Sequence, residues 1–339
     1  MDDSRMDSPD HATNAGMSAS RAVTGLRPES FVRLARPRQW AKSAFVIVGP
    51  LYALMDQRAV NVWSLVGAVL AFGFASSACY VINDIRDREE DRRHPRKKHR
   101  PIAAGEVSVD AAVKWAVILM ISAAVSVLLV MQQSLSAAVW LGLIVSIYFI
   151  NTTMYSLGVK RFIILDVISL AIGFVLRVLG GCAAAGVEPS TWLLNCTFFV
   201  SMFLAFGKRL GERRTMMGVG EDASAVRGVQ SVYTDDLLRM VVVVTAVGAL
   251  ITYAGYVQAK EADYLGLLGD ESWGFNLLWL TMLPATFGML RCIVLLEAGR
   301  YDDPTELAAR DRGFQAAVVV FGGVMAVLFA ASRLGGGAP

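Results

Sequence analysis

The residues best suited to chemistry are four oxygen-bearing side chains at the end of the second apolar run. Asp84, Asp87 and Asp91 follow one another at steps of three and four residues, and Asn83 lies four residues before Asp87. If the helix continues past the apolar run, this spacing lines one helical face with them. Mg²⁺ binds a few carboxylates and takes its other ligands from water and substrate phosphate. The sequence therefore predicts a magnesium site here, with the three aspartates as catalytic candidates.

A basic segment, RRHPRKKHRPIAAG, follows at once and ends at Gly105. Pro95 predicts the end of the helix, and Pro101 with Gly105 predicts a tight loop after it. Arg100, directly before that loop, is a candidate for binding a substrate phosphate. The alternative interpretation is a helix end solvated by its own charges, in which the arginines between positions 86 and 93 neutralise the acids locally.

The composition places these motifs in a membrane protein. Of the 339 residues, 55% are hydrophobic and only 18% are charged, and the mean hydropathy is +0.49. Such a chain is too apolar for a soluble domain. The four cysteines show no CxxC spacing and no neighbouring histidine, so we interpret them as small core residues. Nothing in the sequence indicates a nucleic-acid partner.

The elements that must position the acidic face are apolar helices. Residues 1–28 are polar and rich in Ser and Asp, which predicts a disordered cytoplasmic tail. Residues 29–42 mix aromatic and basic side chains, as segments at the membrane interface do, with Trp at headgroup depth. The transmembrane catalytic domain is predicted over 43–333. Its nine apolar runs are 43–57, 62–82, 113–131, 136–152, 162–182, 190–207, 237–257, 273–296 and 313–332.

The distribution of positive charge supports this count and orients the chain. With nine spans, 25 of the 32 Lys and Arg residues fall in the segments on one side, and only Arg58, Lys260 and Arg333 fall on the other. Positive residues accumulate on the cytoplasmic side of membrane proteins. We therefore predict a multi-pass protein of the plasma (inner) membrane, with a cytoplasmic N-terminus, an external C-terminus and an active-site cavity that faces the cytoplasm.

Further polar residues fall on the same predicted side, in and after the loop YSLGVKR. Tyr155 and Lys160 are candidates for substrate binding, and Asp166, one turn into the next span, is a catalytic candidate. Arg177, a further candidate for substrate binding, follows Asp166 by eleven residues, close to three helical turns, so both face the same way. For Arg177 the alternative is a side chain that extends to the outer membrane interface.

A third motif, GKRLGERR, ends the sixth span. Lys208, Arg209 and Arg213 are cationic, and Glu212 is the only acid. Arg and Lys at such a place contact phosphate directly, Arg through its fork geometry and Lys as a point charge. Together with Tyr233 further along, these residues are candidates for substrate binding. The alternative is ordinary positive charge on the cytoplasmic side.

Two motifs together carry a resemblance to a known family. The pattern NDxxDxxxD after the second span, followed by a basic loop that ends in RPIAAG, resembles the UbiA-type membrane prenyltransferase superfamily over roughly residues 30–333. The resemblance implies a nine-helix bundle. Typical members carry a second Asp-rich motif at the end of the sixth span, which helps to hold a second Mg²⁺. This chain departs from them there, because the cationic GKRLGERR occupies that place.

The segments RPRQWAK, YSLGVK and GKRLGERR resemble one branch of the superfamily, the decaprenyl-phosphate phosphoribosyltransferases of actinobacterial arabinogalactan and lipoarabinomannan precursor synthesis. That resemblance implies transfer of 5-phosphoribosyl from phosphoribosyl diphosphate to a polyprenyl phosphate, with release of pyrophosphate. Mg²⁺ on the acidic face would neutralise the departing diphosphate. Lys42, at the interface, would meet a phosphate. The other groups implied to fix phosphates are Tyr155, Lys160, Lys208 and Arg209.

Two alternatives remain open from the sequence. The first is a UbiA-type enzyme that moves a prenyl group from its diphosphate to an aromatic or glycerol-phosphate acceptor, against which the missing second Asp-rich motif counts. The second is a non-enzymatic lipid carrier or transporter, against which the absence of paired internal repeats counts. The sequence leaves the oligomeric state open, with a homotrimer among the arrangements.

Overall fold

The computed structural model describes residues 28–55, 60–94, 97–219, 233–264, 274–301 and 304–335, and these residues form helices and turns without a strand. Almost all of the N-terminal tail and Pro95 therefore lie outside the described residues. Eight helical stretches are long and apolar enough to cross a membrane. They contain α3 (Val62–Arg86), α5 (Val109–Leu128), α6 (Leu135–Leu157), α7 (Leu165–Ala185), α8 (Thr191–Val219), α9 (Asp235–Ala259), α11 (Met282–Glu297) and α13 (Arg312–Gly335).

The predicted all-α membrane fold is confirmed, with one difference in the number of spans. The first predicted run corresponds to α2 (Ala44–Met55), which has 12 residues and contains Pro50. Twelve residues alone are fewer than the roughly 20 that cross a bilayer, but a 3₁₀ turn of 7 residues (Pro37–Ser43) runs directly into α2 and lengthens the helical stretch. The outer faces of the longer helices expose large apolar side chains, such as Ile121, Val244 and Val319. Exposed apolar surface of this extent suits lipid rather than water.

Polar side chains in the connecting segments cap the N-termini of several of these helices. The Ser108, Ser134 and Thr234 side chains accept hydrogen bonds from backbone N–H groups in the first turns of α5, α6 and α9. The first N–H groups of a helix have no partner within it, so such caps satisfy donors that the apolar run cannot. The sequence thus marks where these three helices begin.

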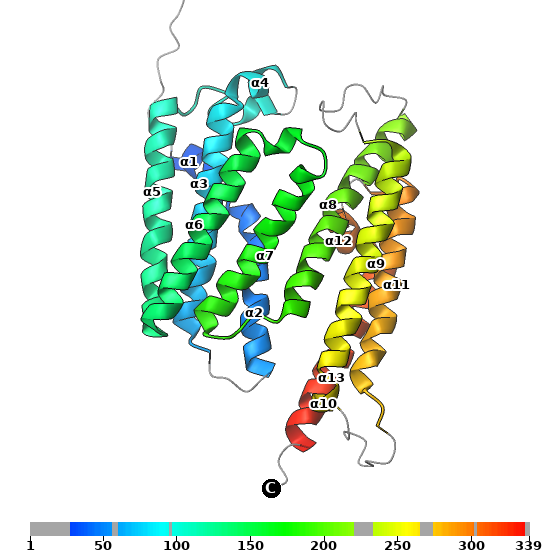
Figure 1. Ribbon diagram of the computed structural model, residues 1–339. Coiled ribbons are helices and arrows are strands. Elements are labelled where there is room, and N and C mark those ends of the chain that lie inside the picture. Colours follow the sequence, from blue (N-terminus) through cyan, green and yellow to red (C-terminus); the bar gives the residue numbers. More distant parts are fainter. Residues whose placement is uncertain are drawn as a thin grey trace, which may run out of the picture.

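The helices pack as two groups that meet where α7 contacts α8 (Figure 1). In the first group, α3 packs on α5 and α6, and α2 packs on α7; in the second, α8 and α11 pack on α9, and α11 packs on α13. Each group has its own apolar core, with Phe72 and Leu141 in one and Phe203 and Leu296 in the other. Gly181 permits the close approach of α2 to α7, because a Cβ atom there would lie 1.8 Å from the Val46 carbonyl oxygen.

The segment predicted at the membrane interface forms α1 (Pro28–Ala35) and a 3₁₀ turn (Pro37–Ser43). The Ser30 hydroxyl donates to Glu106 at 2.7 Å, so α1 is tied to the basic loop. Trp40, which the sequence predicts to lie at headgroup depth, packs on α3. Its ring lies against Gly73 of α3, and its Nε1 donates to the Ser77 hydroxyl at 3.0 Å. The polar partner on α3 holds the indole against the bundle.

The short helix α4 (Arg88–Arg93) lies at the opposite end of the bundle from the last turns of α13 (Figure 1). The loop that joins α6 to α7 lies at the same end as α4. The fold therefore brings the acidic motif and the YSLGVKR loop, which are about 70 residues apart in sequence, to one end of the molecule.

Candidate functional site

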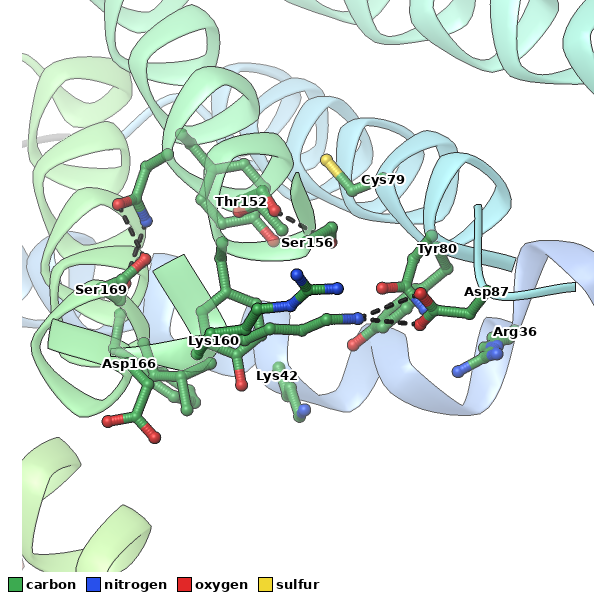
Figure 2. Close-up of a pocket in the computed structure, with 18 of the residues that line it drawn as sticks. Arg36, Lys42, Cys79, Tyr80, Asp87, Thr152, Ser156, Lys160, Asp166 and Ser169 are labelled. Atoms are coloured by element: carbon green, nitrogen blue, oxygen red, sulfur yellow. Dashed lines mark hydrogen bonds and ion pairs between the residues drawn. The ribbon is translucent and has the colours of Figure 1, made fainter. Parts of the chain in front are cut away.

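A cavity of about 660 Å³ lies at that end, between the 3₁₀ turn Pro37–Ser43, α3, α4, α6, α7 and α8 (Figure 2). Most of the side chains singled out from the sequence line it. They are Lys42, Asn83, Asp87, Asp91, Arg100, Tyr155, Lys160, Asp166, Arg177 and Arg209. Five others do not line it: Asp84, Lys208, Glu212, Arg213 and Tyr233.

The acidic motif divides into two parts. Asn83, Asp87 and Asp91 are spaced four residues apart and line the cavity. Backbone hydrogen bonds keep helical register through the junction of α3 and α4, with Asp87 N–H donating to the Asn83 carbonyl at 2.9 Å and Asp91 N–H to the Asp87 carbonyl at 2.8 Å. Asp84 does not line the cavity, although helical spacing puts it only about 60° from Asp87 and about 20° from Asp91. Its side chain therefore serves other partners.

Asp84 is 2% exposed and holds two arginines. Arg36 donates through one nitrogen to both carboxylate oxygens, at 2.5 and 2.8 Å, and Arg100 donates to Oδ1 at 3.1 Å. Arg36 has a left-handed backbone with φ of 52°, an uncommon conformation for a non-glycine residue. Both guanidinium groups line the cavity. Asp84 thus orients two cations toward the site without lining it.

The two cavity-facing aspartates also carry cationic partners. Lys160 Nζ donates to both oxygens of Asp87, at 2.9 and 3.1 Å, as the dashed lines in Figure 2 mark. Arg100 Nη1 donates to Asp91 at 2.7 Å. Each carboxylate of the motif therefore forms an ion pair with a cationic side chain of the protein.

The donor chemistry of this face fits Mg²⁺. Asn83, Asp87 and Asp91 present hard oxygen ligands from successive turns, and such ligands suit this ion. The positions next to the two carboxylates already hold cationic groups, an ammonium and a guanidinium. Among the residues the structure describes, no three His, Cys, Asp or Glu side chains converge closely enough to bind a metal unaided. The remaining ligands would therefore come from Asn83, water or substrate.

The opposite wall of the cavity is built by α6 and α7. Asn151 and Ser169 pair reciprocally across the two helices: the Asn151 amide donates to the Ser169 carbonyl at 2.9 Å, and the Ser169 hydroxyl donates to Asn151 Oδ1 at 3.0 Å. Tyr155 lines the cavity on the same wall. These neutral groups offer hydrogen bonds to a polar ligand without adding charge.

Asp166 lies at the start of α7, and both of its carboxylate oxygens have partners. It is 2% exposed, forms an ion pair with Arg209, and accepts hydrogen bonds from the Tyr233 hydroxyl at 2.9 Å and from Val167 N–H at 2.8 Å. Arg209 Nη1 has no hydrogen-bond partner in the part of the chain that the structure describes. The carboxylate of Asp166 is thus placed to orient Arg209 at the cavity rather than to exchange protons with a substrate.

Tyr233 completes this cluster from outside the cavity. Its hydroxyl also accepts the N–H of Ile164 at 2.7 Å, and Ile164 is a β-branched residue with φ of 70°. Burial raises the pKa of Tyr233 to about 12, so the phenol stays protonated at neutral pH and keeps donating to Asp166. Arg213 donates to the Tyr233 carbonyl. The α8–α9 group is tied in this way to the first turn of α7.

Two residues of the GKRLGERR motif lie further from the site. Lys208 and Glu212 form a pair one turn apart at 4.0 Å, outside the cavity lining. Of this motif, Arg209 is the residue that lines the cavity.

Arg177 lies deepest among the charged groups of the cavity wall. It follows Asp166 by eleven residues of α7, which places it roughly 16 Å further along the helix axis. Its guanidinium donates to the Gly173 carbonyl at 3.2 Å and to the Tyr148 hydroxyl at 2.8 Å. Gly173 is one turn nearer the start of α7, so the side chain turns back toward the cavity. The interpretation of a side chain reaching the outer interface does not fit this geometry.

Several lining residues were not selected from the sequence. Among them are Arg36, Tyr80, Glu90, Asn151 and Ser169. Arg36 belongs to the RPRQWAK segment, but only its left-handed backbone and its pairing with Asp84 bring it to the cavity. Asn151 lies in an apolar run, and a polar amide at membrane depth is itself a signal of function.

Comparison with known proteins assigns the chain to a family. The model of the UbiA prenyltransferase family matches residues 43–310. The chain belongs to this family. The decaprenyl-phosphate phosphoribosyltransferase of Mycolicibacterium smegmatis is 33% identical to this UbiA-family chain over 291 residues, covering 84% of the chain and 87% of that protein. The enzyme of the same name from Corynebacterium glutamicum is 31% identical over 315 residues, covering 88% and 87%.

Solved structures confirm the UbiA-like bundle. A UbiA homolog from Archaeoglobus fulgidus matches with a TM-score of 0.58 at 15% identity, covering 90% of this chain and 98% of that one. The same protein bound to GPP and Mg²⁺ matches with a TM-score of 0.56 at 16% identity. At this identity the likeness shows the fold alone. The family assignment and the fold therefore agree.

Proposed function

We propose that this UbiA-family protein transfers a 5-phosphoribosyl group from phosphoribosyl diphosphate to a polyprenyl phosphate, such as decaprenyl phosphate, with release of pyrophosphate. Support comes from two relatives of that name at 31% and 33% identity over most of the chain. The observation that carries the proposal is the set of cations that line the cavity, Arg36, Arg100, Lys160 and Arg209, each of which is paired with an aspartate. A site with two phosphate-bearing substrates needs such cations.

The reaction requires no general base to activate the acceptor. The second pKa of a phosphomonoester is about 6, so the lipid phosphate is already an anionic nucleophile at neutral pH. Its oxygen forms a bond to C1 of the ribose as the bond from C1 to the diphosphate oxygen breaks, and the electron pair leaves with pyrophosphate. Among the described residues that line the cavity there is no histidine, which is consistent with this chemistry.

The cations of the cavity supply position and charge. Lys160 and Arg100 now contact carboxylates and are placed to exchange them for substrate phosphates. Arg36 and Arg209 are each held by a buried aspartate, so their orientation is fixed before substrate binds. Preorganised cations of this kind stabilise the negative charge that develops on the leaving group.

Asn83, Asp87 and Asp91 would hold Mg²⁺, which when bound neutralises charge on the departing diphosphate. Asp84, which the sequence grouped with them, is proposed instead to position Arg36 and Arg100, since it does not line the cavity.

We also propose the topology predicted from charge: a plasma-membrane protein with the cavity and the N-terminus in the cytoplasm and the C-terminus outside. Phosphoribosyl diphosphate is a soluble cytoplasmic sugar phosphate, so this orientation gives it access to the site. Single cysteines introduced at Ser108 and Ser332, at opposite ends of the bundle, test it with a membrane-impermeant thiol reagent on intact cells. Labelling at Ser332 but not at Ser108 is expected.

The activity is tested with purified protein, Mg²⁺, polyprenyl phosphate and phosphoribosyl diphosphate labelled in the ribose. Label that becomes extractable into organic solvent supports the proposal. If the ribose label stays in the aqueous phase while a prenyl diphosphate donates its prenyl group to an aromatic acceptor, the protein is a prenyltransferase of the more common UbiA kind.

A further inference from the structure

The inner end of the cavity contains a buried cation without an acidic partner. Arg177 is 5% exposed, and no carboxylate of the described residues lies within ion-pair distance of its guanidinium. By contrast, Arg36, Arg100, Lys160 and Arg209, which line the same cavity, each pair with an aspartate. Arg177 is the exception among these cavity cations.

The surroundings of Arg177 hold the guanidinium in place but do not neutralise it. Its carbon atom Cζ lies 4.5 Å from the ring centre of Tyr148, 5.8 Å from that of Phe174 and 5.9 Å from that of Phe72. Two of its nitrogens donate to the Gly173 carbonyl and the Tyr148 hydroxyl. Its Nε is buried and has no hydrogen-bond partner among the described residues. Aromatic faces attract a cation, yet they leave its net charge in a region of low dielectric.

A buried charge of this kind needs an anion from outside the protein. Ionisable groups at membrane depth are costly, and they persist in proteins where they bind a ligand or line a pathway. Arg177 lines the cavity, so an anion that enters from the cytoplasmic end can reach it. The guanidinium fork matches phosphate oxygens in particular. The site therefore suits a phosphate group that lies deeper than the acidic motif.

We propose that Arg177 is the anchor for a phosphomonoester at the inner end of the cavity. This inference rests on the proposed function, in which the diphosphate occupies the Asn83, Asp87 and Asp91 end and leaves a phosphomonoester to be bound elsewhere. Two such groups enter the reaction, the phosphate of the polyprenyl acceptor and the 5-phosphate of the ribosyl donor. Both present the same dianion, and experiment must decide which one reaches Arg177.

The test compares ligands that differ only in that phosphate. Equilibrium binding is measured for polyprenyl phosphate against polyprenyl alcohol, and for phosphoribosyl diphosphate against ribose 1-diphosphate. The proteins are wild type, Arg177→Gln, Arg177→Lys and a control, Arg239→Gln. Arg239 is half exposed on α9, pairs with Glu297 and does not line the cavity. Melting temperature in detergent reports whether each variant folds.

The proposal predicts that Arg177→Gln lowers one of the two phosphate preferences at least tenfold and leaves the other within twofold of wild type. The pair that changes identifies the source of the phosphate. Arg177→Lys should restore part of the lost preference, because it restores the charge without the fork. Arg239→Gln should change neither preference.

Preservation of both preferences in Arg177→Gln would overturn the inference. So would an equal loss of both together with a lowered melting temperature, since that indicates a purely structural arginine. If wild type transfers no ribose label but still prefers polyprenyl phosphate to the alcohol through Arg177, the proposed function fails while the phosphomonoester site stands.

Discussion

Asp84 and Asp87 are three residues apart in one motif, yet the structure predicts different consequences for the change of each to asparagine. Asp84 is 2% exposed and is bound by Arg36 and Arg100, whose side chains are about a quarter exposed. Breaking a buried ion pair costs roughly 3–5 kcal/mol, and water at the arginines reduces that, so we expect Asp84→Asn to destabilise the protein by about 2–3 kcal/mol. Asp87 pairs with Lys160 where both side chains are partly exposed, and Asp87→Asn should cost at most ~1 kcal/mol.

The effect on magnesium should be the reverse. A ligand that binds only the folded protein raises its melting temperature in proportion to affinity and concentration. Melting curves in detergent, with Mg²⁺ and pyrophosphate from zero to saturation, should therefore shift upward for wild type and for Asp84→Asn. Asp87→Asn should show little shift, because a cavity-facing ligand is lost. The matched control is Asp110→Asn, an exposed aspartate in the first turn of α5.

Activity measured beside the melting curves separates the roles further. Asp87→Asn should lower kcat/KM by about 100-fold or more, the order expected when a metal ligand or its orientation is lost. Asp84→Asn should mainly raise the KM for phosphoribosyl diphosphate, since Arg36 and Arg100 lose their orientation. If Asp84→Asn abolished the magnesium-dependent shift as completely as Asp87→Asn, the division of the motif into ligands and a positioning residue would be refuted.

The remaining predictions concern the metal, the acidic motif and the Tyr233 cluster. Chelation of divalent ions should abolish label transfer, and added Mg²⁺ should restore it; full activity in chelator would exclude a metal on the acidic face. Asp91→Asn should reduce turnover far more than Asp222→Asn, which lies outside the described residues, and equal losses would contradict the site. Tyr233→Phe removes the hydroxyl that joins Ile164 to Asp166 and should cost about 1–3 kcal/mol of stability. Because burial raises the pKa of Tyr233 to about 12, activity profiles of wild type and Tyr233→Phe between pH 6 and 9 should have the same shape; a step lost in the variant would show that the phenol titrates there.

The sequence was sufficient for the parts of the site that depend on local periodicity. The four-residue spacing of Asn83, Asp87 and Asp91 predicted their common face because helical register continues through the junction of α3 and α4. The apolar runs predicted the long helices, since length and hydropathy decide membrane insertion. The helix α2 is shorter than a spanning helix of its own would be, and it packs against α7.

The parts that depend on tertiary contacts could not be predicted from periodicity. Asp84 falls close enough to the acidic face to be grouped with it, and only the left-handed Arg36, 48 residues away, explains its separate role. The contact of Tyr233 with Ile164 spans 69 residues. Trp40 carried the signature of an interfacial residue, but the hydroxyl of Ser77 on α3 gives its indole a partner inside the bundle. Each case turns on a hydrogen bond between distant segments.

In the proposed reaction, the diphosphate bound at the acidic face belongs to a sugar and not to a lipid. The most direct measurement follows two labels in two parallel reactions. One contains ribose-labelled phosphoribosyl diphosphate and unlabelled polyprenyl phosphate, and the other contains prenyl-labelled prenyl diphosphate and an aromatic acceptor. Phosphoribosyl transfer predicts ribose label in the lipid fraction, one pyrophosphate released per ribose transferred, and no prenylated aromatic product. Prenyl label on the aromatic acceptor, with the ribose label left in water, would contradict it.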